Sequence, residues 1–260
     1  MTSVMTRLVT ARGLRPLPKA PLKLALVQAR TTPTLALEQS GTVALLVQAL
    51  GWELVDRQSN VELSVRLGPG GIQQQGGPPE TVWVLADPRG QFRAVLSQSS
   101  VAVECGEYSQ WADFRAGLAA VLGALAEVAA PSRVNRFGVR YVNELTDERI
   151  SGEDPAALSQ VLTEELVAVA AALQTPVISS LSELRVREPF GHLSIRHGMT
   201  APGHYLLDFD AYNETTSPFD IERLMEAADA FHARIEALFA WCLQPEYLEY
   251  LAEPADDVSE

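Results

Sequence analysis

The sequence contains the same order of predicted elements twice: a strand, a helix, a meander of short strands and a long helix. In residues 21–131, apolar patterns predict a strand over 22–29, a helix over 37–50, strands over 61–67, 81–86, 91–96 and 101–107, and a helix from about 110. In residues 132–245 they predict strands over 136–145, 177–186, 192–198 and 205–211, and helices over 154–173 and 217–241. The sequence therefore predicts an α+β protein of two similar β-α-β(3-4)-α halves, which form a curved antiparallel sheet with helices on one side.

Turn and capping residues set the boundaries of these elements. The segments Gly68-Pro69-Gly70-Gly71 and Gly76-Gly77-Pro78-Pro79 carry turn chemistry, which favours short antiparallel strands on either side of each. Asp154-Pro155 predicts the start of the 154–173 helix, and Ser217-Pro218-Phe219-Asp220 predicts the start of the last long helix. The short strands are therefore expected to form a meander in each half.

Two terminal segments flank the halves. Residues 1–20 are basic and rich in proline, which predicts a flexible arm, and residues 246–260 are expected to form a C-terminal tail. Tyr247 and Tyr250 lie outside the stripe of the preceding helix, with Leu248 and Leu251 nearby. We expect these side chains either to dock on the fold or to form an oligomer contact, such as the interface of a homodimer.

Composition excludes several classes of protein. With 47% hydrophobic residues the chain can bury a full core, yet no apolar run is long enough to span a bilayer. The formal net charge of −13 disfavours attraction to phosphate backbones, so nucleic acid is an unlikely partner. Arginines interrupt the N-terminal segment where a signal peptide would need an apolar region, so we expect a cytoplasmic protein.

The cysteines and the basic residues add two expectations. Cys105 and Cys242 fall inside apolar elements, which predicts buried thiols rather than a metal or redox site. Lysine occurs only at positions 19 and 23, so arginine supplies the other 18 of the 20 basic residues. Together with abundant alanine, this bias is typical of a GC-rich bacterial genome.

Four segments of the chain resemble a known group of proteins. They are residues 21–30 (PLKLALVQAR), residues 101–114 with Tyr108 and Trp111, residues 136–143 (RFGVRYVN) and residues 207–210 (LDFD). Together they resemble a sporadically distributed family of uncharacterised bacterial proteins, over about residues 21–245. Thr31 stands where an aromatic residue is usual in that family. The resemblance implies fold and bacterial origin, and it implies no mechanism. The order of elements also resembles a tandem TATA-binding-protein-like fold.

Strand alternation gathers a polar constellation on the second half. Because side chains alternate across a strand, Asp208 and Asp210 share one face, and Arg140 lies on the matching face of the first strand of that half. Arginines on two further strands complete a candidate ligand-binding set of Arg140, Arg185, Arg187, Arg196, Asp208 and Asp210. This set is interpreted either as a binding cleft or as an ordinary solvated face with cross-strand ion pairs.

The sequence lacks several common catalytic and cofactor-binding motifs. It has no GxSxG or HExxH motif, and its glycine-rich loops lack the lysine and serine or threonine of a P-loop. A turn near Thr200 that placed His197 opposite His204 would start a metal site, but a third ligand is missing. We therefore expect no cofactor and assign no metal site.

These observations favour a non-enzymatic binding or accessory protein. Its ligand would be a protein partner or a small polar molecule, held on the polar sheet face or in the cleft between the halves. A metal-dependent hydrolase or nuclease-like enzyme that uses Asp208, Asp210 and nearby histidines is an alternative hypothesis. Nucleic-acid binding through the sheet saddle, helped by the basic N-terminal segment, is a weaker one.

Overall fold

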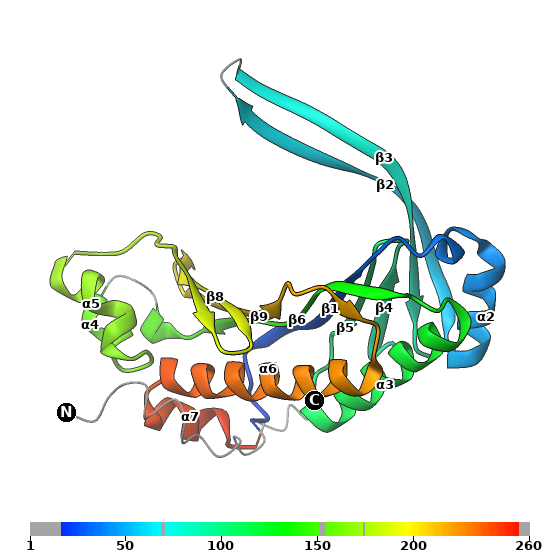
Figure 1. Ribbon diagram of the computed structural model, residues 1–260. Coiled ribbons are helices and arrows are strands. Elements are labelled where there is room, and N and C mark those ends of the chain that lie inside the picture. Colours follow the sequence, from blue (N-terminus) through cyan, green and yellow to red (C-terminus); the bar gives the residue numbers. More distant parts are fainter. Residues whose placement is uncertain (1–16, 69–70, 151–153, 174, 255–260) are drawn as a thin grey trace.

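The computed structural model describes residues 17–68, 71–150, 154–173 and 175–254. Its strands form one curved, open antiparallel sheet in the order β2-β3-β4-β5-β1-β6-β9-β8-β7, and a short strand, β10, pairs with β6. The long helices lie along one side of this sheet, and we call its other side the open face (Figure 1). The predicted α+β class and the two similar halves are confirmed.

The first half contains β1 (Leu22–Thr31), η1 (Leu35–Glu38), α2 (Ser40–Leu50), β2 (Glu53–Gly68), β3 (Gly71–Ala86), β4 (Phe92–Leu96), β5 (Ser100–Cys105) and α3 (Trp111–Val128). The prediction of a turn at residues 76–79 is wrong, because these residues lie within β3. Pro79 pairs with Val61 and Gly76 with Leu63, with a register shift between the pairs. A bulge in a two-stranded ribbon accommodates proline, which has no N–H to donate.

The β2–β3 hairpin extends well beyond the rest of the sheet. β3 pairs with β4 only from Trp83 to Ala86, whereas it pairs with β2 along almost its whole length. Figure 1 shows the far part of this hairpin projecting from the side of the sheet opposite the helices. The ribbon therefore overhangs the open face of the sheet.

The second half contains β6 (Arg133–Thr146), η2 (Glu148–Ile150), α4 (Pro155–Leu158), α5 (Glu164–Leu173), β7 (Ser182–Glu188), β8 (Gly191–Ala201), β9 (His204–Asn213), β10 (Ser217–Pro218), α6 (Ile221–Cys242) and α7 (Pro245–Leu251). Asp154 caps α4 as predicted, since its carboxylate accepts a hydrogen bond from the amide of Ala156. The expected single helix over 154–173 is instead two helices. The intervening residues pair with the end of α6, where the Gln244 side chain donates to the carbonyls of Ser159 and Leu162.

The two halves meet at the centre of the sheet. β1 and β6, the first strand of each half, are antiparallel neighbours, and Val27 lies opposite Val139 in their register. The remaining strands of each half extend outward from this pair. Phe231 of α6 is buried beneath this pair, as are the strand residues that face the helices, among them Val27, Val139 and Phe209. Residues that alternate with these face the opposite side of the sheet.

The C-terminal segment docks on the same molecule. Tyr247 and Leu251 of α7 are buried, and the Leu251 carbonyl accepts a hydrogen bond from the backbone of Lys19. Part of the segment predicted as a tail is therefore helical and packed. Residues 1–16 and 255–260 of the predicted arm and tail lie outside the described residues. Cys105 and Cys242 are buried and free, as predicted. None of the helices in the described ranges is long and apolar enough to cross a membrane.

Candidate functional site

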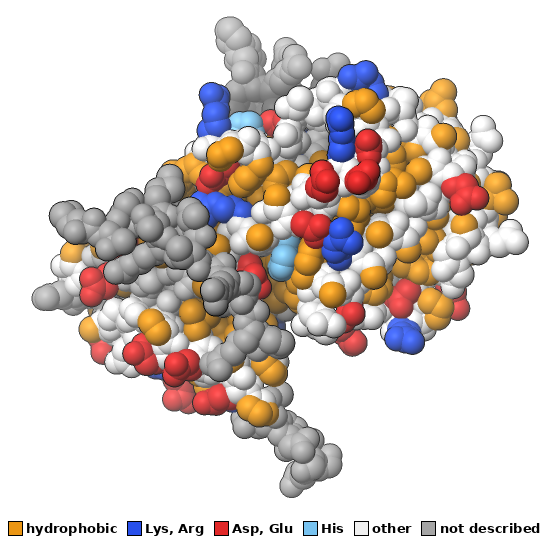
Figure 2. Space-filling view, turned by 60° about the horizontal axis from the view of Figure 1, so that its bottom comes forward, with side chains coloured by type: hydrophobic (Ala, Val, Ile, Leu, Met, Phe, Trp, Pro, Cys, Tyr) orange, Lys and Arg blue, Asp and Glu red, His pale blue; other side chains and the backbone are white. Residues whose placement is uncertain are grey.

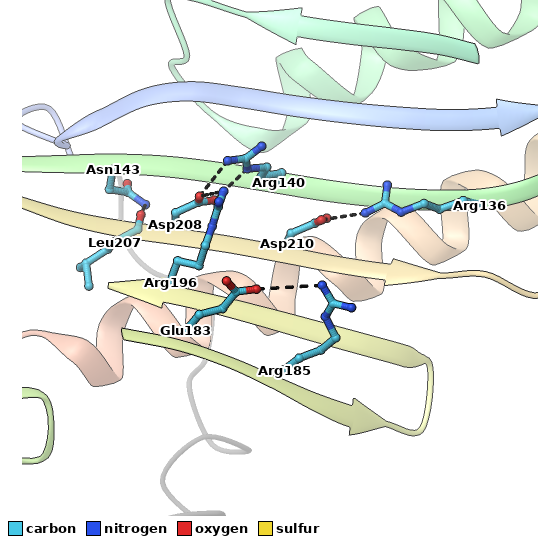
Figure 3. Close-up of polar contacts among 9 residues, drawn as sticks. All are labelled: Arg136, Arg140, Asn143, Glu183, Arg185, Arg196, Leu207, Asp208 and Asp210. Atoms are coloured by element: carbon cyan, nitrogen blue, oxygen red, sulfur yellow. Dashed lines mark hydrogen bonds and ion pairs between the residues drawn. The ribbon is translucent and has the colours of Figure 1, made fainter. Parts of the chain in front are cut away.

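Alternation along β9 separates its core residues from its polar residues. Leu207, Phe209 and Ala211 are completely buried on the helix side, whereas Asp208 and Asp210 lie on the open face. The register places Asp208 opposite Val142 of β6 and Arg196 of β8, and it places Asp210 opposite Arg140. The predicted carboxylates and arginines therefore come together on one face (Figure 3).

Asp208 is at the centre of this polar cluster, which we define as Arg136, Arg140, Arg185, Arg196, Asp208 and Asp210. Nε and Nη2 of Arg140 each donate to the Asp208 carboxylate at 2.8 Å. Arg196 also donates to it through Nη2. The side chain of Asp208 is 4% exposed, whereas those of Arg140 and Arg196 are 35% and 38% exposed. One buried carboxylate thus holds two arginines at the surface.

Asp210 forms the second ion pair of the cluster. It accepts a hydrogen bond of 2.7 Å from Nη2 of Arg136, whose guanidinium also lies 4.4 Å from the ring centroid of Tyr212. Burial raises the pKa of the Asp210 carboxyl, and Arg136 and Arg140 oppose that rise. The hydrogen bond from Arg140 to Asp208 raises the pKa of the guanidinium, although burial opposes it. Arg140 is therefore held as a cation.

Gly138 has no side chain, which leaves space for Tyr212 beneath the polar cluster. A Cβ at this position would lie 2.7 Å from Cβ of Tyr212 and 3.0 Å from the Ala211 carbonyl. Contacts as short as these require the neighbours to move. The absence of a side chain at Gly138 lets the Tyr212 ring lie close to β6, beneath Arg136.

The two predicted arginines of β7 lie at the edge of the cluster. Arg185 is 63% exposed and lies 4.0 Å from Glu183, so that ion pair is loose. Arg187 is exposed and pairs in register with His192, away from the carboxylates. The structure therefore brings together five of the six predicted residues and leaves Arg187 apart.

Two adjoining hollows lie on this face. The larger, of about 300 Å³, is lined by Arg30, Arg136, Arg140 and Arg185 together with Leu26, Gln28, Gly138, Ser194, Asp210, Tyr212 and Glu214. The smaller, of about 210 Å³, is lined by Arg140, Glu183, Arg185, Ser194, Arg196, Asp208 and Asp210. Both are open and polar, so they can accept a charged group.

The histidines do not join this site as a metal centre. The register places His197 opposite Leu207 and His204 opposite Ala201, so the suggested His197–His204 pairing is wrong. The ring of His197 binds the Tyr205 hydroxyl at 2.8 Å on the helix side, whereas His204 binds Glu144. In the described part of the chain, no three histidine, cysteine or acidic side chains gather as metal ligands.

A third cavity, of about 320 Å³, lies on the other side of the sheet, between the halves. Its lining comes from the N-terminal side of α3, from β6 and from α6, and it includes Tyr108, Trp111, Tyr141, His232 and Phe239. The helix side of the molecule is hollowed, and hydrophobic side chains lie around the hollow (Figure 2). This aromatic pocket is separate from the polar cluster.

Sequence reasoning missed both Arg136 and the aromatic pocket. Arg136 has the same parity as Arg140 on one strand, so alternation alone could have placed it on the open face. The pocket offered no such signal, because Trp111 and its partner Asp229 are 118 residues apart. Its residues come together only when α3 and α6 pack side by side.

No protein-family model matches the sequence, and no curated protein matches it significantly.

Proposed function

We propose that this protein is a non-enzymatic binding protein that holds an anionic group on the open face of its second half. The observation that carries the proposal is the burial of Asp208 beneath two arginines. Its carboxylate has little contact with solvent, whereas the side chains of both arginines remain about one third exposed. A guanidinium has more N–H donors than one carboxylate can accept, so donors remain for a ligand.

The charge of the larger hollow supports an anionic ligand. Four arginines line it, against Asp210 and Glu214. The whole chain carries a formal charge of −13, so an excess of cations in one hollow runs against the overall composition. Gln28 and Ser194 add uncharged donors within the same hollow. A carboxylate or a phosphate matches this arrangement.

The ligand is either a small polar molecule or an acidic segment of a protein partner. The overhanging β2–β3 hairpin supports a partner larger than the hollow, because it projects over the same open face (Figure 1). Asp208 and Asp210 are bonded to arginines. In the proposed site these two carboxylates position the arginines and have no metal-binding or hydrolytic role.

Thermal unfolding in phosphate tests the small-ligand form of the proposal. Low-millimolar sodium phosphate should raise the Tm relative to sodium chloride of equal ionic strength, because a ligand that binds only the native state stabilises it. Arg196→Gln should reduce the difference in Tm between the two salts. Arg93→Gln is the matched control, since Arg93 is exposed on β4 of the first half. Equal Tm values in both salts for the unmodified protein would contradict binding of phosphate.

We further propose a cytoplasmic bacterial protein with a tandem TATA-binding-protein-like fold, related to the family that the four sequence segments resemble. The support for the fold is the central β1–β6 pair, from which the strands of each half extend outward. The support for the family is that Tyr108 and Trp111 of one segment and Tyr141 and Asn143 of another line the same pocket. Duplex DNA, added to the same thermal assay, tests the nucleic-acid alternative.

A further inference from the structure

The aromatic pocket on the helix side has walls from both halves. The segment Tyr108–Ala112 supplies one wall, and Tyr141 and Asn143 of β6 supply another, with His232, Glu236 and Phe239 of α6 opposite. Leu17, Ala20 and Leu22 complete the lining. The volume of about 320 Å³ is enough for a small organic molecule.

The rings of this pocket are held in fixed positions. The Trp111 indole stacks on His232, with 4.4 Å between centroids and an interplanar angle of 9°. Its Nε1 donates to Asp229 at 2.8 Å, and Arg115 donates to the same carboxylate. Tyr108 and Tyr141 meet edge to face at 5.6 Å. A prearranged set of rings favours a flat aromatic ligand, which loses little freedom on binding.

A short chain of hydroxyl groups gives the pocket its polar contact. The Tyr141 hydroxyl lies 2.9 Å from Nδ1 of His232 and 3.4 Å from the hydroxyl of Tyr108. If Nδ1 of His232 accepts, each tyrosine donates along the chain, and the Tyr108 oxygen can accept from a ligand. If Nδ1 donates, the chain reverses, and Tyr108 can donate to a ligand. Tyr108 therefore suits a ligand with either a donor or an acceptor.

The groups of this chain are uncharged at neutral pH. Burial lowers the pKa of His232 to about 4, although Asp229 opposes that shift, and burial raises the pKa of Tyr108 to about 12. Among the described lining residues there is no arginine or lysine to balance an anion. The lining therefore suits a ligand without negative charge, in contrast to the polar cluster on the other side of the sheet.

We propose that the aromatic pocket binds a small, uncharged, planar aromatic molecule through ring contacts and one hydrogen bond with Tyr108. The ring would contact the aromatic walls, and its hydroxyl or ring N–H would meet the Tyr108 oxygen. The pocket is a second binding site, independent of the anionic ligand proposed for the open face.

A pair of matched probes tests this site. NMR titration of the full-length ¹⁵N-labelled protein should show p-cresol binding with a Kd on the order of 1 mM, and toluene binding about fivefold more weakly, because toluene lacks the hydroxyl. Tyr108→Phe should weaken p-cresol binding by about fivefold and leave toluene binding unchanged. Tyr212→Phe, on the open face, should change neither affinity.

A variant that blocks the pocket keeps the test decisive. Ala112 is exposed and lines the pocket, so Ala112→Trp should weaken both probes by more than about tenfold without loss of fold. The proposal is overturned if p-cresol produces no saturable shifts, if it binds no better than toluene, or if Ala112→Trp binds it normally. Arg185→Glu should retain p-cresol binding, which distinguishes failure at this site from failure of the anionic site.

Discussion

Asp208 accepts two hydrogen bonds of 2.8 Å from Arg140, while its own side chain is only 4% exposed. The pair joins the first strand of the second half to the last strand of its meander, since Arg140 lies on β6 and Asp208 on β9. Arg196 reaches the same carboxylate from β8. A single acidic residue therefore both ties three strands together and fixes the cations that we propose to bind a ligand.

Replacing Asp208 should destabilise the fold. Asp208→Asn removes the negative charge and points an amide at two guanidinium groups, which are then left partly buried without the carboxylate that binds them. We expect the free energy of unfolding to fall by about 2–3 kcal/mol, less than for a fully buried pair because both arginines reach solvent. Urea denaturation measures the change. Glu183→Gln, at an exposed ion pair, should change it by less than about 0.5 kcal/mol.

A methyl group at position 138 should disturb the floor of the polar cluster. Gly138→Ala places Cβ 2.7 Å from Cβ of Tyr212, so we expect a loss of about 1–3 kcal/mol in the free energy of unfolding. Gly123→Ala in the middle of α3 is the control. A Cβ there meets nothing within 4 Å, so this variant should gain about 0.5–1 kcal/mol. Equal effects of the two variants would argue against close packing at Gly138.

Stability should depend on pH through His232. Its pKa is about 4 in the folded protein, mainly because of burial, and about 6.5 when unfolded, so between these values the unfolded chain binds more protons. The contribution of His232 to the free energy of unfolding is therefore complete above about pH 6.5 and is lost as the pH falls toward 4. We expect a loss of roughly 2 kcal/mol between pH 7.5 and pH 5 from this residue.

Variants of two histidines isolate that contribution. His232 bonds to Tyr141, interacts with the charge of Asp229 and lines the same pocket as Glu236. His232→Gln keeps a hydrogen-bonding group beside Tyr141 without titrating near neutral pH. Urea midpoints of His232→Gln should therefore depend less on pH than those of the unmodified protein. His204→Gln, at an exposed contact with Glu144, should follow the unmodified protein closely. An unchanged pH dependence in His232→Gln would refute the assignment.

The break between α4 and α5 should depend on Gln244. Its side-chain amide donates to the carbonyls of Ser159 and Leu162, which the split helix leaves without helical partners. Gln244→Ala should lower the free energy of unfolding by about 1–2 kcal/mol, as measured by urea denaturation. Gln48→Ala on the exposed surface of α2 should change it little or raise it slightly.

Local patterns predicted the elements and the open-face residues, because both depend on neighbours along the chain. Alternation along β9 was sufficient to place Asp208 and Asp210 on one face, away from Phe209. It could not assign Arg136 to Asp210, because that pairing depends on the register between β6 and β9. It also could not reveal that Asp208 is buried.

The errors arose where distant contacts override local preference. The split of the 154–173 helix follows from pairing with the end of α6, and Gln244 lies 82 residues beyond Leu162. The extension of β3 through Pro78 and Pro79 reflects a partner strand that tolerates a bulge. The aromatic pocket likewise depends on contacts between α3 and α6, so a single sequence contains no local sign of it.

The most direct test of the anionic site is the affinity of a fluorescently labelled octaglutamate peptide, measured by anisotropy at several salt concentrations. The account predicts binding that weakens as NaCl rises, a loss of about tenfold or more in Arg185→Glu, and little change in Arg93→Glu on the first half. Octalysine should bind this face no better in the unmodified protein than in Arg185→Glu. Octaglutamate binding that is absent, or that both glutamate variants weaken equally, would contradict an anion site on the open face of the second half.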